Sequence, residues 1–457
     1  MNGDAPGQPP GPIDRALRVF GDVRLGEGAR VVLMFLNILV LLIAYYIIKT
    51  VREPLILLGG GAEVKSYAGA VQALLLVVYV PLYGWVASRL PRFKLIVTVV
   101  LFFVACIQVF FFWGQSGLPY VGMAFYVWVG IFSLTTIAQF WSYANDIYSR
   151  PDGERLFPLI AVGSTAGAFL GAVVAEALFA AGIGPFVLMQ LAAGLLLLHL
   201  GLYVLVARQA SVAAPGGAPA GAPLKKSDGF GLVLRNRYLL LFALMLILLN
   251  VVNAVGEYML DVYVQSAADG VVAQAVAANP SLDAAGQHAV AESFIGQFKG
   301  AYFLGFNLLA VVLQAFFVSR LVKRAGVAGA VLALPLVALG SYGFAAVGAG
   351  LAIVRWAKTA ENATDYSVMN TGKQMLWLPT SREEKYKAKQ AIDTFFVRTG
   401  DMIAGGVVYA GTHWLALGPT GFARLNLVVV AAWIALALLV LRENRRLTDS
   451  MAERQAA

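Results

Sequence analysis

The chain has 457 residues, of which 60% are hydrophobic and only 13% are charged, and its mean hydropathy is +0.75. Soluble domains contain about 45–50% apolar and about 25% charged residues, so this composition excludes an ordinary soluble protein. It predicts an all-α polytopic membrane protein embedded in a lipid bilayer. The formal net charge of +9 is explained by basic loops at one membrane surface, and we expect no nucleic-acid partner.

Residues 1–29 precede the first apolar segment and are expected to form a cytoplasmic N-terminal tail. Apolar segments of about 20 residues predict transmembrane helices. Twelve such segments follow, at residues 30–58, 66–88, 93–114, 119–147, 156–180, 184–207, 236–264, 297–319, 326–347, 349–372, 389–412 and 420–441. Residues 209–235 are rich in Ala, Pro and Gly and predict a flexible cytoplasmic linker. We therefore expect two six-helix bundles, at 30–208 and 236–442, and a cytoplasmic tail at 443–457.

Lysine and arginine are distributed unevenly among the predicted loops. They lie before the first span and after every even-numbered span, whereas the connections at 115–118, 181–183, 265–296 and 413–419 contain none. The positive-inside rule therefore places both termini in the cytoplasm. The connection after the first span breaks this pattern, since Lys49, Arg52 and Lys65 lie on the side expected to be outer. A violation of an otherwise regular pattern favours a functional explanation.

The two halves of the chain resemble each other. Three sets of residues match: the Ser-Arg-Leu triplets at 88–90 and 319–321, Gly167 with Gly400, and the pair Lys49 and Glu53 with Glu257 and Asp261. The residue numbers of the matching positions differ by 231 in the first set, 233 in the second and 208 in the third. We assign the change in this offset to a longer outer loop at 265–296. Two homologous six-helix halves joined by a cytoplasmic linker are typical of major-facilitator-type secondary transporters.

The first span carries charges that hydrocarbon does not tolerate easily. Lys49, Arg52 and Glu53 lie within it, and charges at that depth usually face a bundle interior or a water-filled cavity. Tyr45, Lys49 and Arg52 follow the spacing i, i+4 and i+7, so they share one helical face. This face predicts an anion-binding site of Lys49 and Arg52, with Glu53 in a coupling or gating role. The alternative is a pair of interfacial cations that extend outward to the membrane surface.

The fourth and fifth spans carry two regular patterns of small or polar residues. A polar stripe on the fourth span consists of Thr135, Gln139, Ser142 and Asp146. It predicts either a cavity lining, with Gln139 as the substrate-binding residue, or interhelical hydrogen bonds. The fifth span has glycines at four-residue spacing, at positions 163, 167 and 171. This spacing is typical of close helix packing.

The seventh span places Glu257 and Asp261 one turn apart. Two ionised carboxylates at this spacing repel each other, so one is expected to be protonated or paired with a cation such as Lys49 or Arg52. We interpret Glu257 as a substrate-site residue and Asp261 as a gating residue. The alternatives are a proton-coupling carboxylate and a solvated outer helix end.

The tenth and eleventh spans are the most polar. Lys358, Glu361, Asn362 and Asp365 follow helical spacing on one face of the tenth, which no lipid-facing surface would carry. We predict a substrate contact for Lys358 and coupling or gating for Glu361 and Asp365. In the eleventh, Lys389 and Asp393 lie one turn apart. Lys389 is either a contact for an anionic substrate or a cytoplasmic anchor, and Asp393 is assigned to coupling. An amphipathic soluble segment in place of the tenth span would leave an odd number of spans.

The segment around residues 364–393 resembles the ATP/ADP translocase (nucleotide transporter) family of plastids and intracellular bacteria. The matching stretches are TDYSVMN at 364–370, LPTSREEKYKAKQAID at 378–393, VREPL at 51–55, GGAE at 60–63 and RLFPL at 155–159. This resemblance implies a twelve-helix nucleotide exchanger of the major-facilitator type. Carried over residue by residue, it points to Arg52, Glu257 and Lys389 as substrate-site residues.

These patterns favour a secondary transporter that exchanges nucleotides or a related organic anion by alternating access between the two halves. One alternative is a proton-coupled transporter of another solute, with Glu257 or Asp365 titrating; another is a non-transporting membrane sensor or partner protein. The sequence has a single cysteine, no GxxxxGK[ST] loop and no catalytic triad, so we expect no enzyme activity, metal or cofactor. We expect a monomer in the inner (plasma) membrane of a bacterium, with a small anionic molecule as its partner.

Overall fold

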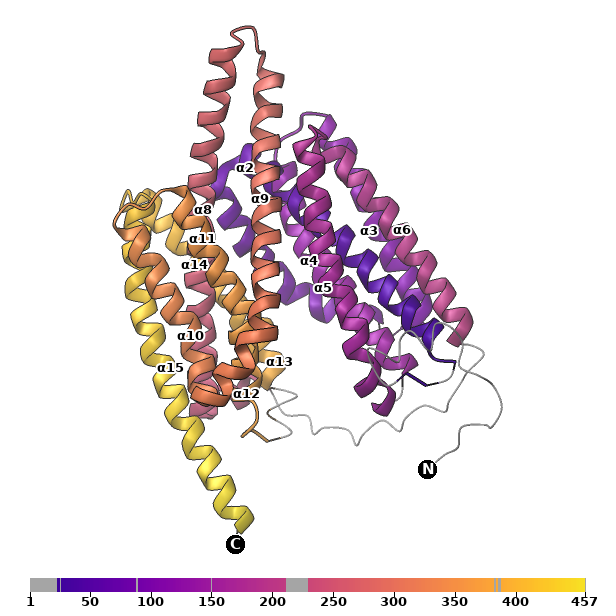
Figure 1. Ribbon diagram of the computed structural model, residues 1–457, viewed down its shortest axis with the longest axis vertical. Helices are drawn as coiled ribbons and strands as arrows, with labels where there is room; N and C mark the ends of the chain where they lie inside the picture. Colours follow the sequence, from indigo (N-terminus) through magenta and orange to yellow (C-terminus); the bar gives the residue numbers. More distant parts are fainter. Residues whose placement is uncertain are drawn as a thin grey trace. The chain divides into compact units, whose positions relative to one another are not determined.

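The computed structural model describes residues 23–24, 26–87, 89–148, 150–210, 229–381, 384 and 388–456, and no β-strand occurs among them. Most of the predicted N-terminal tail and the centre of the predicted linker lie outside these residues. The chain is an all-α integral membrane protein, as the composition predicts (Figure 1). Its helices are α2 (Gly28–Ala87), α3 (Arg92–Gln115), α4 (Val121–Ile147), α5 (Arg150–Ala180), α6 (Pro185–Ala210), α7 (Gly229–Arg235), α8 (Arg237–Ala278), α9 (Ala284–Val312), η1 (Leu313–Val318), α10 (Ser319–Ala346), α11 (Leu351–Thr364), η2 (Asp365–Met369), α12 (Asn370–Leu376), α13 (Lys389–Ala391), η4 (Ile392–Phe396), α14 (Val397–His413) and α15 (Pro419–Ala456).

Within the described residues, eight helices are long and apolar enough to cross a membrane. Two of them contain two predicted spans each, because α2 is broken at Gly61 and the continuous run from α9 to α10 is broken at Gly326. The tenth and eleventh predicted spans are too polar to be included among the eight. They are nevertheless helical, as α11, η2 and α12 and as α13, η4 and α14. A helix therefore covers each of the twelve predicted spans.

The predicted outer loop at 265–296 is wrong, because most of it is helix. Helix α8 continues to Ala278 and α9 begins at Ala284, so only residues 279–283 connect them. The Asp283 side chain caps α9 by accepting a hydrogen bond from the Gly286 backbone N–H at 2.8 Å. Residues 265–278 are rich in alanine, which favours helix whether or not the segment is apolar enough for a membrane. The two helices lie side by side and extend beyond α11 and α14 (Figure 1).

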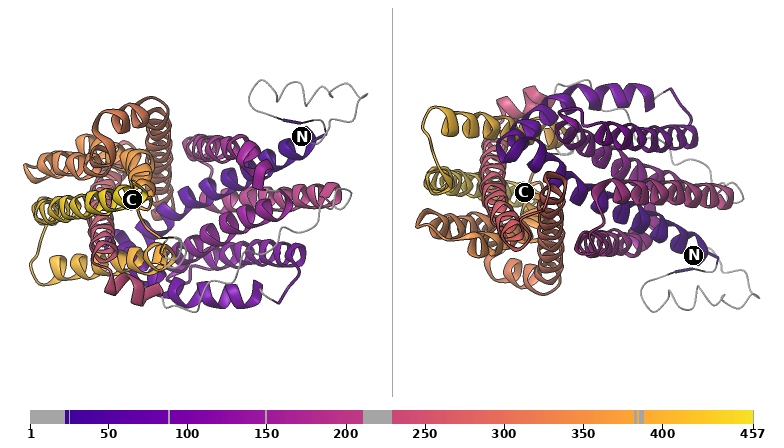
Figure 2. Two further views of the ribbon diagram at one scale, coloured as in Figure 1. Left: turned by 90° about the horizontal axis from the view of Figure 1, so that it is seen from below. Right: turned by 90° about the horizontal axis from the view of Figure 1, so that it is seen from above.

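The described chain forms two compact units. The first takes its residues from Met1–Val51, Gly84–Leu118 and Val129–Gly221, and the second from Arg52–Tyr83, Pro119–Trp128 and Ala222–Ala457. Helices α8 to α15, coloured pink to yellow in Figure 2, pack together within the second unit. Residues 28–51 and 84–87 of α2 belong to the first unit, and Arg52–Tyr83 belongs to the second.

Close packing between α5 and α2 in the first unit confirms the interpretation of the glycine pattern. A Cβ added at Gly163 would lie 2.7 Å from the Phe35 carbonyl oxygen, and one at Gly171 would lie 2.8 Å from that of Ile43. Gly167 lies equally close to the Leu39 carbonyl. Glycine is required here because the two backbones approach within a distance that a methyl group would occupy.

Candidate functional site

The second unit contains two adjacent groups of buried polar side chains. We call the first the Glu53 cluster, which consists of Arg52, Glu53, Lys65, Asp261 and Lys299. We call the second the Lys358 cluster, which consists of Asn253, Glu257, Tyr302, Tyr342, Lys358, Glu361 and Asn362. Helix α8 supplies Glu257 and Asp261 one turn apart, and α9 supplies Tyr302 and Lys299 at three-residue spacing. Because α8 packs on α9, both clusters are held by the same pair of helices.

The Glu53 cluster is a continuous chain of ion pairs. Glu53 Oε1 lies 2.6 Å from Arg52 Nη2, and its Oε2 lies 2.5 Å from Lys65 Nζ and 3.5 Å from Lys299 Nζ. Lys65 Nζ also lies 2.7 Å from Asp261 Oδ2, and Lys299 pairs with Asp261 Oδ1. The side chains of Glu53, Asp261 and Lys299 are each only 1% exposed. Lys65 and Lys299 thus bridge the carboxylates of two helices that are far apart in sequence.

The break in α2 at Gly61 brings Lys65 back to Glu53. Gly61 has φ 80° and ψ 175°, a conformation that is essentially restricted to glycine. The break leaves helical backbone groups without their usual partners, and the Gln265 side chain of α8 supplies new ones. Its Oε1 accepts from the Ala62 N–H at 2.8 Å, and its Nε2 donates to the Leu57 carbonyl at 2.9 Å. One amide side chain therefore fixes the direction of α2 just before Lys65.

The charges of the Glu53 cluster do not cancel. Three cations face two carboxylates, so the cluster carries one net positive charge if all five groups are ionised. Taking ions out of water is expensive and is offset only by close pairing. Arg52 has the most exposed side chain of the three cations, at 14%. Its guanidinium also lies over the Tyr126 ring, 4.3 Å from the centroid.

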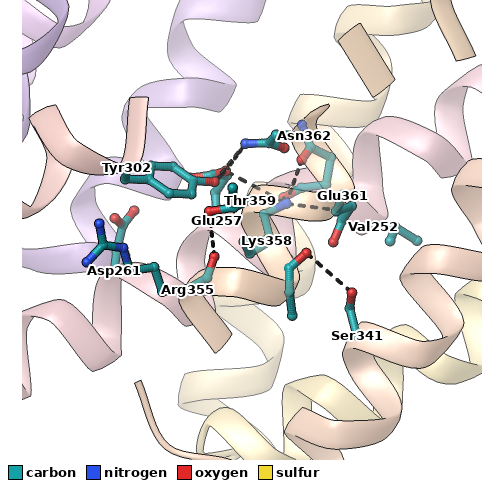
Figure 3. Close-up of polar contacts among 12 residues, drawn as sticks. Val252, Glu257, Asp261, Tyr302, Ser341, Arg355, Lys358, Thr359, Glu361 and Asn362 are labelled. Carbon is teal, nitrogen blue, oxygen red and sulfur yellow. Dashed lines mark hydrogen bonds and ion pairs between the residues drawn. The ribbon is translucent and has the colours of Figure 1, made fainter. Parts of the chain in front are cut away.

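The Lys358 cluster joins α8, α9, α10 and α11 (Figure 3). Lys358 Nζ donates to Asn253 Oδ1 at 2.7 Å and to Glu361 Oε1 at 3.0 Å, and it lies 3.7 Å from Glu257 Oε1. Figure 3 shows the side chains of Tyr302, Glu257 and Lys358 directed toward one another from three helices. One cation therefore serves two carboxylates in this cluster.

Glu257 is the most exposed charged side chain of the Lys358 cluster. Its Oε1 accepts hydrogen bonds from Tyr302 Oη at 2.8 Å and from Asn362 Nδ2 at 2.9 Å. Its side chain is 26% exposed, compared with 3% for Lys358 and 4% for Glu361. Glu257 is therefore positioned to meet a solute that reaches this cluster.

The seventh-span carboxylates have partners that the sequence did not suggest. We expected a cation such as Lys49 or Arg52 for them. Asp261 pairs with Lys65 and Lys299, and Glu257 lies near Lys358. Arg52 pairs with Glu53, its neighbour in the chain. The reason is geometric. The break at Gly61 brings Lys65 to Asp261, and the packing of α8 on α9 brings Lys299 to it.

Five of the predicted site residues lie outside the two clusters. Lys49 and Gln139 belong to the first unit, where Lys49 Nζ lies 5.1 Å from the Tyr46 ring centroid and Gln139 is 6% exposed on α4. Lys389 donates to Gln374 Oε1 at 2.8 Å, and Asp365 lies 3.4 Å from Lys373 Nζ. Asp365 begins the π-helical turn η2, and the exposed Asp393 lies in the π-helical turn η4. Such turns occur frequently at functional sites.

Sequence reasoning missed five members of the site: Lys65, Asn253, Lys299, Tyr302 and Tyr342. Lys65 left a signal, because it belongs to the one connection that violates the positive-inside pattern. Lys299 is a lone cation in an apolar span, which is also a signal of function. In the part of the chain that the structure describes, no three His, Cys, Asp or Glu side chains gather where they would hold a metal ion.

Comparisons with known proteins identify the fold. No family model and no curated protein matches the chain. Among solved structures, the nucleoside transporter NupG aligns with a TM-score of 0.58 and 14% identity, over 90% of this chain and 98% of its own. A bacterial homologue of the iron transporter ferroportin, in an inward-facing state, aligns with a TM-score of 0.60 and 14% identity, over 91% and 98%. The peptide transporter POT in complex with sulfate aligns with a TM-score of 0.59 and 15% identity, over 95% of this chain and 98% of its own.

At these identities the likeness establishes the fold alone. The chain shares the all-α fold of these three proteins, over nearly the whole length of each. All three neighbours are named as transporters. Their cargoes differ from one another, so the fold does not select a substrate.

Proposed function

We propose that this protein is a secondary transporter of the nucleotide-translocase type, which exchanges a nucleotide or a related organic anion by alternating access. The observation that supports this function best is the net positive charge of the Glu53 cluster. Intramembrane charges are expensive and mark substrate or ion pathways. Three cations grouped around two carboxylates at that depth favour an anionic solute.

We assign substrate contact to Arg52 first. Its planar guanidinium binds carboxylate or phosphate groups through two hydrogen bonds, and it is the most exposed cation of the cluster. Glu53 occupies the same guanidinium through Nε at 3.0 Å and Nη2 at 2.6 Å. In this proposal an anionic group of the solute competes with Glu53 for Arg52, and Glu53 and Asp261 hold the cations when no solute is bound. Lys49, Gln139, Glu257, Lys358 and Lys389 remain substrate-site candidates on the sequence argument.

The size of the charge excess limits the substrate class. A nucleoside triphosphate carries several negative charges, whereas the three cations of the Glu53 cluster already face two carboxylates. We therefore expect substrates of low negative charge, such as a nucleoside monophosphate or an organic acid, to be transported better than a triphosphate. We place the protein in the inner membrane of a bacterium with both termini in the cytoplasm, as the loop charges predict.

Uptake into proteoliposomes tests this function. Vesicles are preloaded with unlabelled nucleotide or organic acid, and entry of the labelled compound is measured for a panel from nucleosides to triphosphates. We expect Arg52→Glu to reduce exchange at least tenfold and Arg52→Lys to retain part of it, because Lys keeps the charge but loses the planar fork. Arg446→Glu is the control, since Arg446 is 56% exposed and pairs only locally with Glu443 at 3.2 Å. Full exchange by Arg52→Glu would refute the site assignment.

A second candidate function rests on the Lys358 cluster. One cation shared by two carboxylates suits a proton-coupled transporter of another solute, because a carboxyl without its own cation favours the neutral form. The same vesicles decide between the two functions. A pH gradient alone drives uptake in a proton-coupled transporter, whereas an exchanger requires counter-substrate inside. Absence of transport for every compound, by a correctly folded protein, would favour the non-transporting class.

A further inference from the structure

We propose that Glu361 is a proton-binding site, and that it holds a proton between its Oε1 and Tyr342 Oη. The presence of the proton rests on the geometry of α8, α10 and α11. Its role in driving solute movement rests on the proposed transport function. Neither Tyr342 nor the distribution of protons around it was apparent from the sequence.

The first observation is the count of protons at Tyr342. Its hydroxyl lies 3.0 Å from the Val252 carbonyl oxygen and 3.2 Å from Glu361 Oε1. A tyrosine hydroxyl has one proton to donate, and a backbone carbonyl accepts only. If Glu361 is ionised, two acceptors share that single proton. If Glu361 is protonated, Tyr342 donates to Val252 and Glu361 donates to Tyr342 Oη, so that each close contact has its own proton.

The second observation is the other carboxyl oxygen. Glu361 Oε2 is buried and receives no hydrogen bond from any residue that the structure describes. The two donors near the carboxyl, Lys358 Nζ at 3.0 Å and Tyr342, both approach Oε1. Ionisation would spread negative charge onto Oε2, where nothing donates to it. An ionised carboxylate without a donor is far costlier to bury than a neutral carbonyl oxygen.

The third observation is that two carboxyl groups, Glu361 and Glu257, share one cation. Lys358 lies near both Glu361 and Glu257. Glu257 has two further donors, Tyr302 and Asn362, and is the more exposed carboxyl. Glu257 is therefore the better place for a negative charge, which leaves the proton to Glu361.

Titratable and polar groups from five helices surround Glu361. Helix α11 contributes Lys358, α8 contributes Glu257 and, one turn further, Asp261, α9 contributes Tyr302 and Lys299, and α10 contributes Tyr342. Helix α15 contributes the neutral Asn426, whose Nδ2 donates to the Val252 carbonyl at 3.1 Å. The cations other than Lys358 are engaged by Asp261 and Glu53 in the neighbouring cluster.

Release of the proton has a balanced route. The Glu361 carboxyl loses H⁺ to water, and the Tyr342 hydroxyl then turns its own proton from Val252 to Glu361 Oε1. Asn426 continues to donate to the Val252 carbonyl, so no backbone group loses its last partner. The new carboxylate holds Lys358, already 3.0 Å from Glu361 and 3.7 Å from Glu257, more strongly, and this changes the charge that faces a solute at Glu257. Proton release and solute binding are thereby linked through Lys358.

Infrared spectroscopy of the purified protein in lipid nanodiscs tests the proposal. A protonated carboxyl group has a C=O band that an ionised one lacks, and H₂O-to-D₂O exchange shifts it. We expect the wild-type protein at neutral pH to show such a band, Glu361→Gln to lose it, and the control Asp449→Asn, which removes an exposed carboxyl of α15, to retain it. A band that survives in Glu361→Gln, or that disappears in Asp449→Asn, would overturn the assignment.

A second variant keeps the test decisive if Glu361→Gln does not fold. Tyr342→Phe removes the acceptor of the Glu361 proton, so the band should move to the higher frequency of a carboxyl without a hydrogen-bond acceptor. An unmoved band would show that the proton is not shared with Tyr342. The infrared band does not depend on transport, so it decides the proton site even if no transported compound is found. If transport is found, uptake by Glu361→Gln should no longer depend on a pH gradient.

Discussion

At the scale of single residues, the stability of the site depends more on the balance between buried cations and carboxylates than on the number of ion pairs. Glu53 accepts from Arg52, Lys65 and Lys299, so it compensates three cations at once. Lys299 is one of three cations around two carboxylates, so its loss leaves two of each. Breaking a buried ion pair is costly because of the uncompensated charge that remains. The two residues therefore differ in importance although both are fully buried.

We predict that Glu53→Gln destabilises the protein by about 3–5 kcal/mol, because one carboxylate would remain for three buried cations. Lys299→Met should cost less, since it leaves two cations for two carboxylates. The double variant should be more stable than Glu53→Gln alone. Thermal unfolding of the purified protein measures the order. Asp365→Asn is the control: the half-exposed Asp365–Lys373 pair at 3.4 Å is expected to contribute at most about 1 kcal/mol. Equal effects of Glu53→Gln and Lys299→Met would contradict the charge argument.

The sequence located the carboxylates of the site but not all their partners. Glu53, Glu257, Asp261 and Glu361 stood out because a charge in an apolar span is conspicuous. Lys65 lies 12 residues from Glu53, and helical spacing gives no reason for the two to meet. Their contact requires the backbone break at Gly61, and a run of three glycines does not reveal which of them adopts a positive φ.

At the scale of elements, breaks within long helices position the site as much as the helices do. Helix α2 runs for 60 residues, and only Gly61 within it has a non-helical conformation. Gln265 on α8 satisfies the carbonyl before the break and the N–H after it. This fixes α2 against α8 at the height where Glu53, Lys65 and Asp261 meet. The sequence indicated an ending near residues 59–61, and the structure has a redirected helix there instead of a loop.

We predict that Gly61→Ala destabilises the protein by about 1–3 kcal/mol, because φ 80° with ψ 175° is strained for any residue with a Cβ. The added Cβ would also lie 3.3 Å from Gln265 Nε2, which would disturb the hydrogen bond to Leu57. Gly59→Ala is the matched control. That position has no positive φ and nothing within 4 Å of an added Cβ, so alanine should be neutral or stabilising by about 0.5–1 kcal/mol. Thermal unfolding and exchange are measured for both, and similar behaviour of the two variants would argue against a structural role for the break.

At the scale of the whole molecule, the internal repeat predicted from the sequence reappears in the packing of each unit. In the first unit Gly167 of α5 lies against the Leu39 carbonyl of α2. In the second unit a Cβ at Gly400 of α14 would lie 2.8 Å from the Ile247 carbonyl of α8. The glycines are separated by 233 residues and the carbonyls by 208, the same offsets that the sequence comparison gave. The fifth and eleventh spans thus pack on the first and seventh by the same glycine contact.

The fold was more predictable than the site for a physical reason. The order of the spans and the internal repeat follow from hydropathy and loop charge, which can be judged from short stretches of sequence. The predicted order agrees with the helices of the structure. The length of α8 and α9 was missed because the residues beyond Val264 are helix-forming without being apolar enough for a membrane. The site depends on which long-range neighbours the packing creates. The carboxylates, Arg52 and Lys358 could be singled out before that packing was known, whereas Lys65, Lys299 and the two tyrosines could not.

The orientation of the chain gives the last prediction. Residues 279–283 join α8 to α9, and their connection belongs to a stretch, 265–296, without Lys or Arg, whereas the α15 end carries Arg442, Arg445 and Arg446. The positive-inside rule then places the hairpin tip outside and α15 in the cytoplasm. In a Cys106→Ser background, a membrane-impermeant maleimide should label Ser281→Cys in intact spheroplasts and Asp449→Cys only after permeabilisation. Both positions are exposed, so accessibility within the fold does not separate them. Labelling of Asp449→Cys in sealed spheroplasts, with Ser281→Cys protected, would reverse the orientation. It would also place the Lys49–Lys65 segment near the cytoplasmic end of its span, where its cations would no longer violate the loop-charge pattern.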